Sequence, residues 1–280
     1  MRSIVILGAG ELGGALARQV AAADIVSRVV LVDDGGTVAA GKALDIRQAA
    51  PIDGYSTDVV GSTDETAVVG ADAIVIADRT AGAEWQDDAG AALVRRIAHI
   101  NHSAMILCAG ARQLEIVERG VREGGIARRR LLGSAPEAFR SAVLSMTALE
   151  AGCSPGEISL TVLGRPVNHL IVPWDDASIG GRRATDVLPP PAITRLDTRL
   201  ARLWPPGPLT LASAATRFLA AAATRGRATL CAFVAVPRDE GHAGRVAMLP
   251  VTMNRAGIAT VLAPALNARD RARLDTALHG

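Results

Sequence analysis

The sequence predicts an α/β protein in which a doubly wound parallel-sheet domain is followed by a second domain of the α+β type. Three observations lead to this prediction. Short runs of Val, Ile and Leu alternate with longer helical patterns through the first half, which is typical of parallel strands joined by crossover helices. The apolar runs are continuous, as in strands buried on both faces. After Gly152 this alternation gives way to strand pairs and proline clusters.

The first half contains the strands and helices of the expected doubly wound domain, residues 1–140. Each helical segment is long enough to connect one strand to the next parallel strand. We expect strands at 3–7, 28–32, 57–62, 72–77, 104–108 and 128–134, and helices at 11–23, 37–50, 84–100 and 111–125.

The second half, residues 141–280, is expected to form the α+β domain. A helix that begins at Pro136 should end at Gly152, because proline is favoured in the first helical turn and glycine just past the last one. A helix is also expected over 192–204, where Ile193, Leu196, Leu200 and Leu203 share one face. The other expected elements are strands at 158–164, 168–174, 228–236 and 246–253, and helices over 212–224 and from about 267.

The composition excludes several classes of function. The net charge of the 280 residues is only +2, and the one tight basic run, Arg128 to Arg130, is flanked by apolar residues. Because aromatic residues make up 2% of the chain, few side chains are available to stack on bases. Nucleic acid is therefore not an expected partner. A single lysine, Lys42, and a single tyrosine, Tyr55, on separate segments leave no residues for a Tyr-Lys catalytic pair.

The expected location is the cytoplasm. The chain has three cysteines, an odd number that cannot all pair, and each lies in apolar surroundings. This is expected of buried thiols in a reducing compartment. The first apolar run is too short for a signal peptide and ends in glycines. No stretch approaches the roughly 20 apolar residues of a membrane span.

A glycine motif at the first strand predicts a dinucleotide site. "GAGELGG" places Gly8, Gly10 and Gly13 in the spacing G-x-G-x-x-G, between a predicted strand and a predicted helix. These glycines allow a tight turn, close approach of a pyrophosphate and close packing of helix on strand. Asp33 follows about 20 residues later at a strand end, where a carboxylate binds the adenosine ribose. Asp34 would repel a 2′-phosphate, so the expected cofactor is NAD.

Two other interpretations of glycine motifs remain beside this one. The glycine turn could serve chain packing alone. "GTVAAGKA", residues 36–43, resembles the phosphate loop G-x-x-x-x-G-K-[ST], but Ala43 cannot coordinate magnesium and Lys42 lies inside a predicted helix. No metal site is expected, because the five histidines show no ligand spacing with cysteines or acids: His99, His102, His169, His242 and His279.

Five segments resemble the malate/lactate dehydrogenase family, in order across nearly the whole chain: "ILGAGELGG", "GKALDIRQAAPI", "GADAIVIA", "LLGSA" and "ATLCAFVAV". The resemblance implies an N-terminal Rossmann NAD-binding domain and a C-terminal substrate domain. It also implies a homo-oligomer, with "GKALDIRQ" and the C-terminal helix as contact surfaces. Members of this family transfer hydride between a 2-hydroxy acid and NAD, using a histidine, an aspartate, arginines and an asparagine.

The positions that match these catalytic residues carry other side chains. An ungapped match of "GSAPEAFRSAVLSMTALEAG" places Phe139 at the aspartate and Ala142 at the substrate-binding arginine. In "VLGRPVNHLIVPW", where the family has Gly-x-His-Gly-Asp, Gly164 as the anchor places Pro166 at the histidine, three residues before His169. Neither phenylalanine nor proline can exchange a proton.

The loops that carry the remaining family residues also differ. Gly110 and Ala111 stand where the asparagine usually precedes a proline. The flexible loop is shortened to "ADRTAGAEWQDDAG", which offers Arg79 together with three acids. An acidic loop of this kind would repel a dicarboxylate. The acids are Glu84, Asp87 and Asp88.

Four side chains are the candidates for a rebuilt active site: Arg79, Glu137, Arg165 and His169. Each also has an ordinary structural interpretation. The arginines can be solvated loop charges, Glu137 an acid of a first helical turn, and His169 a strand-edge histidine bonded to backbone or water.

Three hypotheses follow for the function. The leading one is a malate/lactate dehydrogenase-like NAD-binding protein that has lost standard 2-hydroxy acid dehydrogenase activity and senses NAD(H) or has a structural role. The enzyme alternative is an NAD-dependent oxidoreductase with a rebuilt active site for a different small substrate. The third is a scaffold that binds no nucleotide, and NAD binding distinguishes it from the other two.

Overall fold

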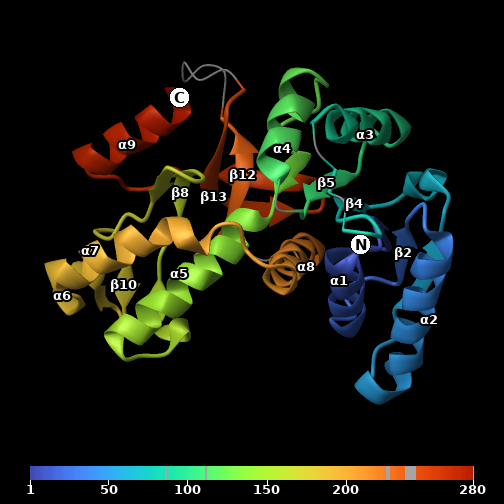
Figure 1. Ribbon diagram of the computed structural model, residues 1–280, viewed down its shortest axis with the longest axis horizontal. Coiled ribbons are helices and arrows are strands. Elements are labelled where there is room, and N and C mark those ends of the chain that lie inside the picture. Colours follow the sequence, from blue (N-terminus) through green and yellow to red (C-terminus); the bar gives the residue numbers. More distant parts are fainter. Residues whose placement is uncertain (83, 86, 111, 225–227, 237–243, 280) are drawn as a thin grey trace.

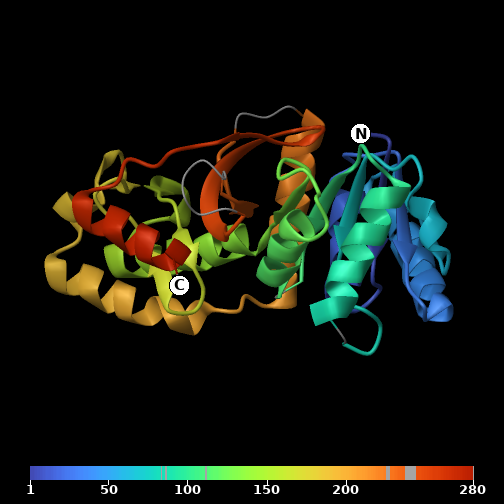
Figure 2. The same ribbon diagram turned by 90° about the horizontal axis from the view of Figure 1, so that it is seen from above.

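The structure is a computed structural model that describes residues 1–280 except 83, 86, 111, 225–227, 237–243 and 280. One long mixed sheet runs through the molecule, with helices on both faces (Figure 1). Seen from above, the N-terminal residues lie at one end of this sheet and the last helix near the other (Figure 2). Within the described ranges, no helix is long and apolar enough to cross a membrane.

The N-terminal half forms the parallel part of the sheet, in the strand order β3-β2-β1-β4-β5-β6. Because β4 crosses back to the other side of β1, the chain reverses direction along the sheet between β3 and β4. In such sheets, ligands bind at this reversal, beyond the carboxyl ends of the strands. The strands are β1 (Ser3–Leu7), β2 (Arg28–Val32), β3 (Asp58–Ser62), β4 (Ala73–Ile76), β5 (Met105–Cys108) and β6 (Leu131–Gly133).

Four helices connect or flank these strands, and a short 3-10 helix, η1 (Glu65–Val68), precedes β4. The expected glycine end of the helix that follows them is confirmed: α5 (Ala135–Ala151) ends at Gly152, which adopts the left-handed conformation with φ 65°. The four helices are α1 (Glu11–Ala22), α2 (Gly36–Asp53), α3 (Asp87–Ile100) and α4 (Gln113–Arg122).

The C-terminal half continues the same sheet in antiparallel fashion, in the order β6-β12-β13-β8-β9, with β14 beside β13. A separate small sheet has the order β11-β10-β7. The strands are β7 (Ile158–Ser159), β8 (Leu163–Arg165), β9 (His169–Ile171), β10 (Ser178–Ile179), β11 (Arg182–Arg183), β12 (Leu230–Ala235), β13 (Val246–Asn254) and β14 (Gly257–Val261). The helical elements are η2 (Pro155–Glu157), α6 (Ala184–Val187), α7 (Pro190–Arg199), η3 (Leu200–Leu203), α8 (Pro208–Thr224) and α9 (Ala268–His279).

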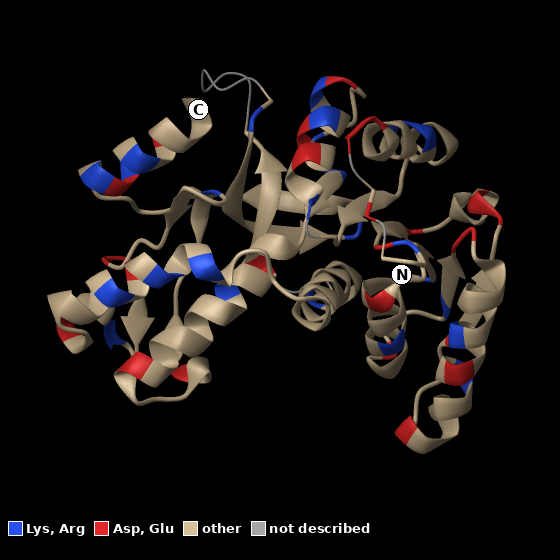
Figure 3. Cartoon of the chain, viewed as in Figure 1, with Lys and Arg blue, Asp and Glu red and all other residues tan. Residues whose placement is uncertain are grey.

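The core is aliphatic and continuous across both halves. All residues of β4, β5 and β12 are buried, as continuous apolar runs predict. In Figure 3 the strands of the central sheet are mostly tan, and charged residues lie along the helices and in the loops. Helix α8 lies beside α1, where the Thr216 hydroxyl contacts the Gln19 amide oxygen at 3.3 Å.

The predicted fold class is confirmed, but several predicted elements need correction. Residues 128–130 form a turn before β6, and the helix expected over 192–204 is α7 followed by the 3-10 helix η3. The segment 158–164 is not one strand: β7 belongs to the small sheet and β8 to the main sheet, and residues 160–162 between them belong to neither strand. An apolar run alone does not reveal that a strand changes its sheet. The strand β14 and the short β10 and β11 were not predicted. Residue 140, the expected domain boundary, lies inside α5, and the division into two domains stays a prediction.

Candidate functional site

The glycine motif forms a tight turn between β1 and α1. Gly8 has φ +110°, a conformation that side chains rarely tolerate, and its amide donates to the Val32 carbonyl at 2.8 Å. A Cβ on Gly13 would collide with the Gly8 carbonyl oxygen, so the helix can pack this closely only on glycine. Both positions therefore need glycine for the backbone geometry that the sequence motif predicts.

Asp33 lies just past β2 and is 7% exposed. One carboxylate oxygen accepts from the amides of Ala9 at 2.8 Å and Thr80 at 2.9 Å. The other accepts from the Gly35 amide at 2.8 Å and from the Thr80 hydroxyl. Burial acts to raise the pKa of Asp33, but the hydrogen bonds from Thr80, Ala9 and Gly35 outweigh it and lower the pKa below the usual value.

A second carboxylate, which sequence reasoning missed, lies at the amino end of α1. Asp78 follows β4 and accepts hydrogen bonds from the amides of Leu12 at 3.2 Å and Gly13 at 2.8 Å. Its carbonyl oxygen accepts from the Gly10 amide at 3.0 Å. The signal available in the sequence was its position directly after a strand, because the carboxyl ends of parallel strands meet at one edge of the sheet.

The single lysine also belongs to this site, which the sequence did not indicate. Lys42 lies inside α2, as expected, and its ammonium donates to the carbonyl oxygens of Ala9 at 2.8 Å and Gly10 at 2.6 Å. It therefore holds the glycine loop from the side of α2. Its position in the middle of a helix agrees with the view that residues 36–43 are not a phosphate loop.

Arg79 lies at the carboxyl ends of β1 and β2, beside Asp33 and Asp34. Its guanidinium pairs with the exposed Asp34 carboxylate at 2.7 Å and lies over the Trp85 ring, 4.9 Å from the ring centre. The cavity between these groups and the strand ends has a volume of about 10 Å³, room for about one water molecule.

The backbone of this region fits NAD, but the groups that would bind NAD already have partners within the chain. The glycine turn and the helix that follows it have the backbone form of a dinucleotide site. However, the amides of α1 and the carboxylate of Asp33, which would hold the pyrophosphate and the ribose, are engaged by Asp78 and Thr80.

The aspartate and arginine positions of the resemblance lie on α5. Phe139 is fully buried and contacts Trp204 edge-on, with ring centres 6.1 Å apart. Glu137, two residues earlier on the same helix, is 4% exposed and forms two hydrogen bonds with Arg140, at 2.7 and 3.0 Å. It also accepts from the Cys231 amide of β12 at 2.9 Å. The Glu137 carboxylate thus joins α5 to the sheet.

The hairpin of β8 and β9 carries the next two candidates. Arg165 donates to the Glu118 carboxylate at 3.0 Å and to the Val246 carbonyl at 2.7 Å. The turn between the two strands contains Pro166, and His169 is exposed at the start of β9. His169 lines a cavity of about 330 Å³ against α9, together with Asn168, Ile171, Arg269, Ala272, Arg273 and Thr276.

The structure does not bring the four candidates together. Within the described part of the chain, no hydrogen bond or ion pair joins any two of Arg79, Glu137, Arg165 and His169. Arg79 is the one beside the glycine loop. Figures 1 and 2 place α9, against which His169 lies, at the end of the molecule opposite α2.

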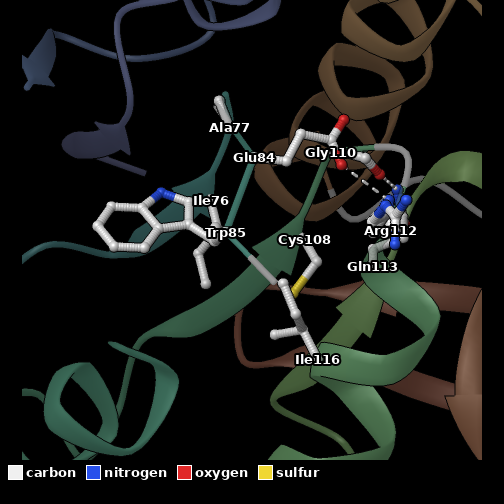
Figure 4. A pocket seen from close by; sticks show the side chains of 9 residues that line it. All are labelled: Ile76, Ala77, Glu84, Trp85, Cys108, Gly110, Arg112, Gln113 and Ile116. Carbon is white, nitrogen blue, oxygen red and sulfur yellow. Dashed lines mark hydrogen bonds between the residues drawn. The ribbon is translucent and has the colours of Figure 1, made fainter. Parts of the chain in front are cut away.

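A small cavity of about 10 Å³ lies at the ends of β4 and β5. Figure 4 shows Trp85 on one side of it and Glu84 directed toward Arg112, whose amide donates to the Glu84 carboxylate at 3.1 Å. Gly110, which the resemblance matches to the asparagine, lines the cavity with Cys108; Ala111 lies outside the described residues. Burial raises the pKa of the Cys108 thiol to about 12, so it is not a thiolate nucleophile at neutral pH.

No three His, Cys, Asp or Glu side chains among the described residues are grouped so that they could hold a metal ion. His242 lies outside the described residues.

Comparison with known proteins shows similarity to malate and lactate dehydrogenases. The chain is 28% identical to a malate dehydrogenase of Thioalkalivibrio sulfidiphilus, over 100% of this chain and 97% of the relative. It is 37% identical to a malate dehydrogenase of Anaplasma marginale over 100 residues, which are 34% of this chain and 32% of the relative. No protein-family model matches the chain.

Solved structures share the whole fold at low sequence identity. A malate dehydrogenase from Salinibacter ruber superimposes with a TM-score of 0.87 at 20% identity, covering 99% of this chain and 95% of that one. A lactate dehydrogenase from Cryptosporidium parvum, solved with lactic acid and nicotinamide adenine dinucleotide, gives a TM-score of 0.89 at 19% identity with the same coverage. The fold is that of these dehydrogenases, and the full-length sequence similarity supports the malate/lactate dehydrogenase family.

Proposed function

We propose that this chain is a malate/lactate dehydrogenase-like, NAD(H)-binding protein that has lost standard 2-hydroxy acid dehydrogenase activity. One observation carries the proposal: the position matched to the catalytic aspartate holds Phe139, which is fully buried beside Trp204. No carboxylate is available there to orient a histidine, and Pro166 stands at the matched histidine position.

The cofactor would be held by the backbone around Gly8, Gly10 and Gly13 and by Asp33. When bound, NAD accepts a hydride at its nicotinamide ring and NADH donates one. The side chains of this chain supply no proton acceptor at the matched position. Binding without turnover suits a protein that senses NAD(H), or one with a structural role in an assembly.

The protein is proposed to act in the cytoplasm as a homo-oligomer. Residues 41–48 of α2 and helix α9 are the proposed contact surfaces, by analogy with the family. Two large apolar side chains exposed on α2 support this choice: Leu44 is 53% and Ile52 86% exposed.

The test has two measurements on the purified protein. Calorimetric titration with NAD and NADH should detect binding, and NADH oxidation with oxaloacetate or pyruvate should show no turnover above the buffer rate. Turnover that disappears in Gly10→Trp would refute the loss of activity, because tryptophan at this position blocks the glycine loop. Absence of binding at millimolar cofactor would instead favour a scaffold that needs no nucleotide.

A second candidate is an NAD-dependent oxidoreductase with a rebuilt site for a different small substrate. The full-length similarity to a malate dehydrogenase favours it, and the cavity of about 330 Å³ at His169, lined by Arg269 and Arg273, is large enough for a small ligand but lies against α9, away from the glycine loop. A screen of small carboxylates with NAD would test it, and His169→Ala should then abolish any activity found.

A further inference from the structure

Side chains of this chain occupy the hydrogen-bonding groups of its predicted dinucleotide site. The carboxylate of Asp78 accepts from the Leu12 and Gly13 amides. These amides belong to the first turn of α1, whose donors have no partner inside the helix and attract anions. A carboxylate of the chain therefore takes the donors that a pyrophosphate needs.

The space left by Gly10 is also taken. A Cβ built on Gly10 would collide with the carboxylate oxygen and carbon of Asp78. The second glycine of the motif lets a pyrophosphate approach the backbone. Here it lets the side chain of Asp78 approach instead.

The next residues of the same segment occupy the neighbouring groups. Thr80 donates its amide and its hydroxyl to Asp33, whose remaining acceptor sites are used by the Ala9 and Gly35 amides. A carboxylate has about four acceptor positions, so Asp33 has none left for ribose hydroxyls. Arg79, paired with Asp34, lines the small cavity beside Asp33.

The residues that follow the segment 78–80 show backbone strain and an unpaired polar atom. Ala81, directly after it, and Asp87, at the start of α3, have φ of 76° and 50°, which is strained for residues with a Cβ. The Trp85 indole nitrogen is buried and has no hydrogen-bond partner among the described residues. Both features favour a segment that can leave this position when a better ligand for α1 arrives.

We infer that residues 78–80 are an internal occupant of the dinucleotide site: Asp78 takes the place of the pyrophosphate and Thr80 that of the ribose hydroxyl. The cofactor binds only after this segment moves away. The inference rests on the proposed function, since it requires a dinucleotide site beneath the segment. Asp78 is thus the residue that sets the affinity for the cofactor, through competition and through repulsion between like charges.

The test compares NADH affinity in four variants and the parent protein by fluorescence titration and calorimetry. Asp78→Ala removes the competing carboxylate, and Asp78→Asn removes its charge while keeping an acceptor oxygen for α1. Asp58→Ala and Asp58→Asn are matched controls, because Asp58 is a half-exposed acid at the opposite end of a strand, with only a 3.8 Å contact to Arg28. Circular dichroism and thermal melting establish that each variant is folded.

We expect both Asp78 variants to bind NADH at least about tenfold more tightly than the parent, and the affinity of the controls to be unchanged. Removing a negative charge from the phosphate site should raise the affinity for NADH by at least this factor. If Asp78→Ala does not fold, Asp78→Asn alone decides the result. Equal or weaker binding by the Asp78 variants, with measurable binding by the parent, overturns the inference and leaves the proposed function standing. Absence of NADH binding in every protein overturns both.

Discussion

At the scale of single residues, hydrogen bonds from the backbone decide the chemistry of the site. The Asp33 carboxylate receives three amides and one hydroxyl, all from the chain itself. The pKa of Asp33 is lowered because these bonds favour the charged form more strongly than burial disfavours it. The glycine loop therefore depends on an ionised carboxylate.

This dependence predicts an acid sensitivity. A carboxyl whose pKa is lowered in the folded state adds stability above its unfolded pKa, near 3.8, and this stability is lost as the pH falls through the lower, folded value. Asp33→Asn should reduce the free energy of unfolding by about 2 kcal/mol at pH 7, because an amide cannot accept all four bonds. Urea titrations from pH 7 to 2 should show this difference shrinking at the acid end. A difference that is constant over the whole range would contradict the argument.

The three cysteines differ in reactivity for a similar reason. Burial raises the pKa values of Cys108 and Cys231 to about 12, whereas Cys153 is partly exposed. In the native protein at pH 8, a thiol reagent such as dithiobis-nitrobenzoate should modify one cysteine rapidly and two only after unfolding. Cys153→Ser should remove the rapid phase. Two or three rapid equivalents in the parent protein would refute this assignment.

At the scale of elements, the acid of the first turn of α5 ties the helix to the sheet. Glu137 forms a bidentate pair with Arg140, accepts from the amide of Cys231 on β12 and lies 3.5 Å from Arg217 of α8. Its interpretation as an ordinary first-turn acid was too simple. The periodicity of a helix shows which face is apolar but does not reveal a charge pair buried beneath that face.

This pair predicts a large effect on stability. Glu137→Ala should cost about 3–5 kcal/mol, because it leaves the Arg140 guanidinium buried without its partner. The double variant Glu137→Ala with Arg140→Ala should cost less than the sum of the two single variants. Urea unfolding of all four proteins measures this coupling. Additive effects would show that the pair contributes nothing beyond its separate contacts.

At the scale of the whole molecule, the main sheet joins the two halves of the chain. Strand β6 pairs with β12, Gly133 opposite Phe233, and α8 of the second half packs beside α1 of the first. The glycine loop and the region of α5 and β8 therefore share one continuous apolar core.

This arrangement predicts that residues 1–140 alone are poorly folded. The fragment loses β12 and α8 and cuts α5 before its end at Ala151. It should bind the dye anilinonaphthalene sulfonate and melt at a lower temperature, with less cooperativity, than the full chain. A fragment of residues 1–152, which keeps all of α5, is the control for the cut helix. A sharp transition of the 1–140 fragment at the temperature of the full chain would refute the prediction.

The sequence by itself determined the strands and helices of the first half and the glycine turn. These features depend on short-range patterns: apolar runs, helix caps and the backbone freedom of Gly8. The tertiary structure alone decided what the site contains. Asp78 reaches α1, and Thr80 reaches Asp33, because β4 lies beside β1, more than 60 residues away in the chain. Such contacts depend on which strand ends become neighbours. The position of Asp78 directly after a strand places it at the edge of the sheet, but no local pattern shows that α1 is its partner.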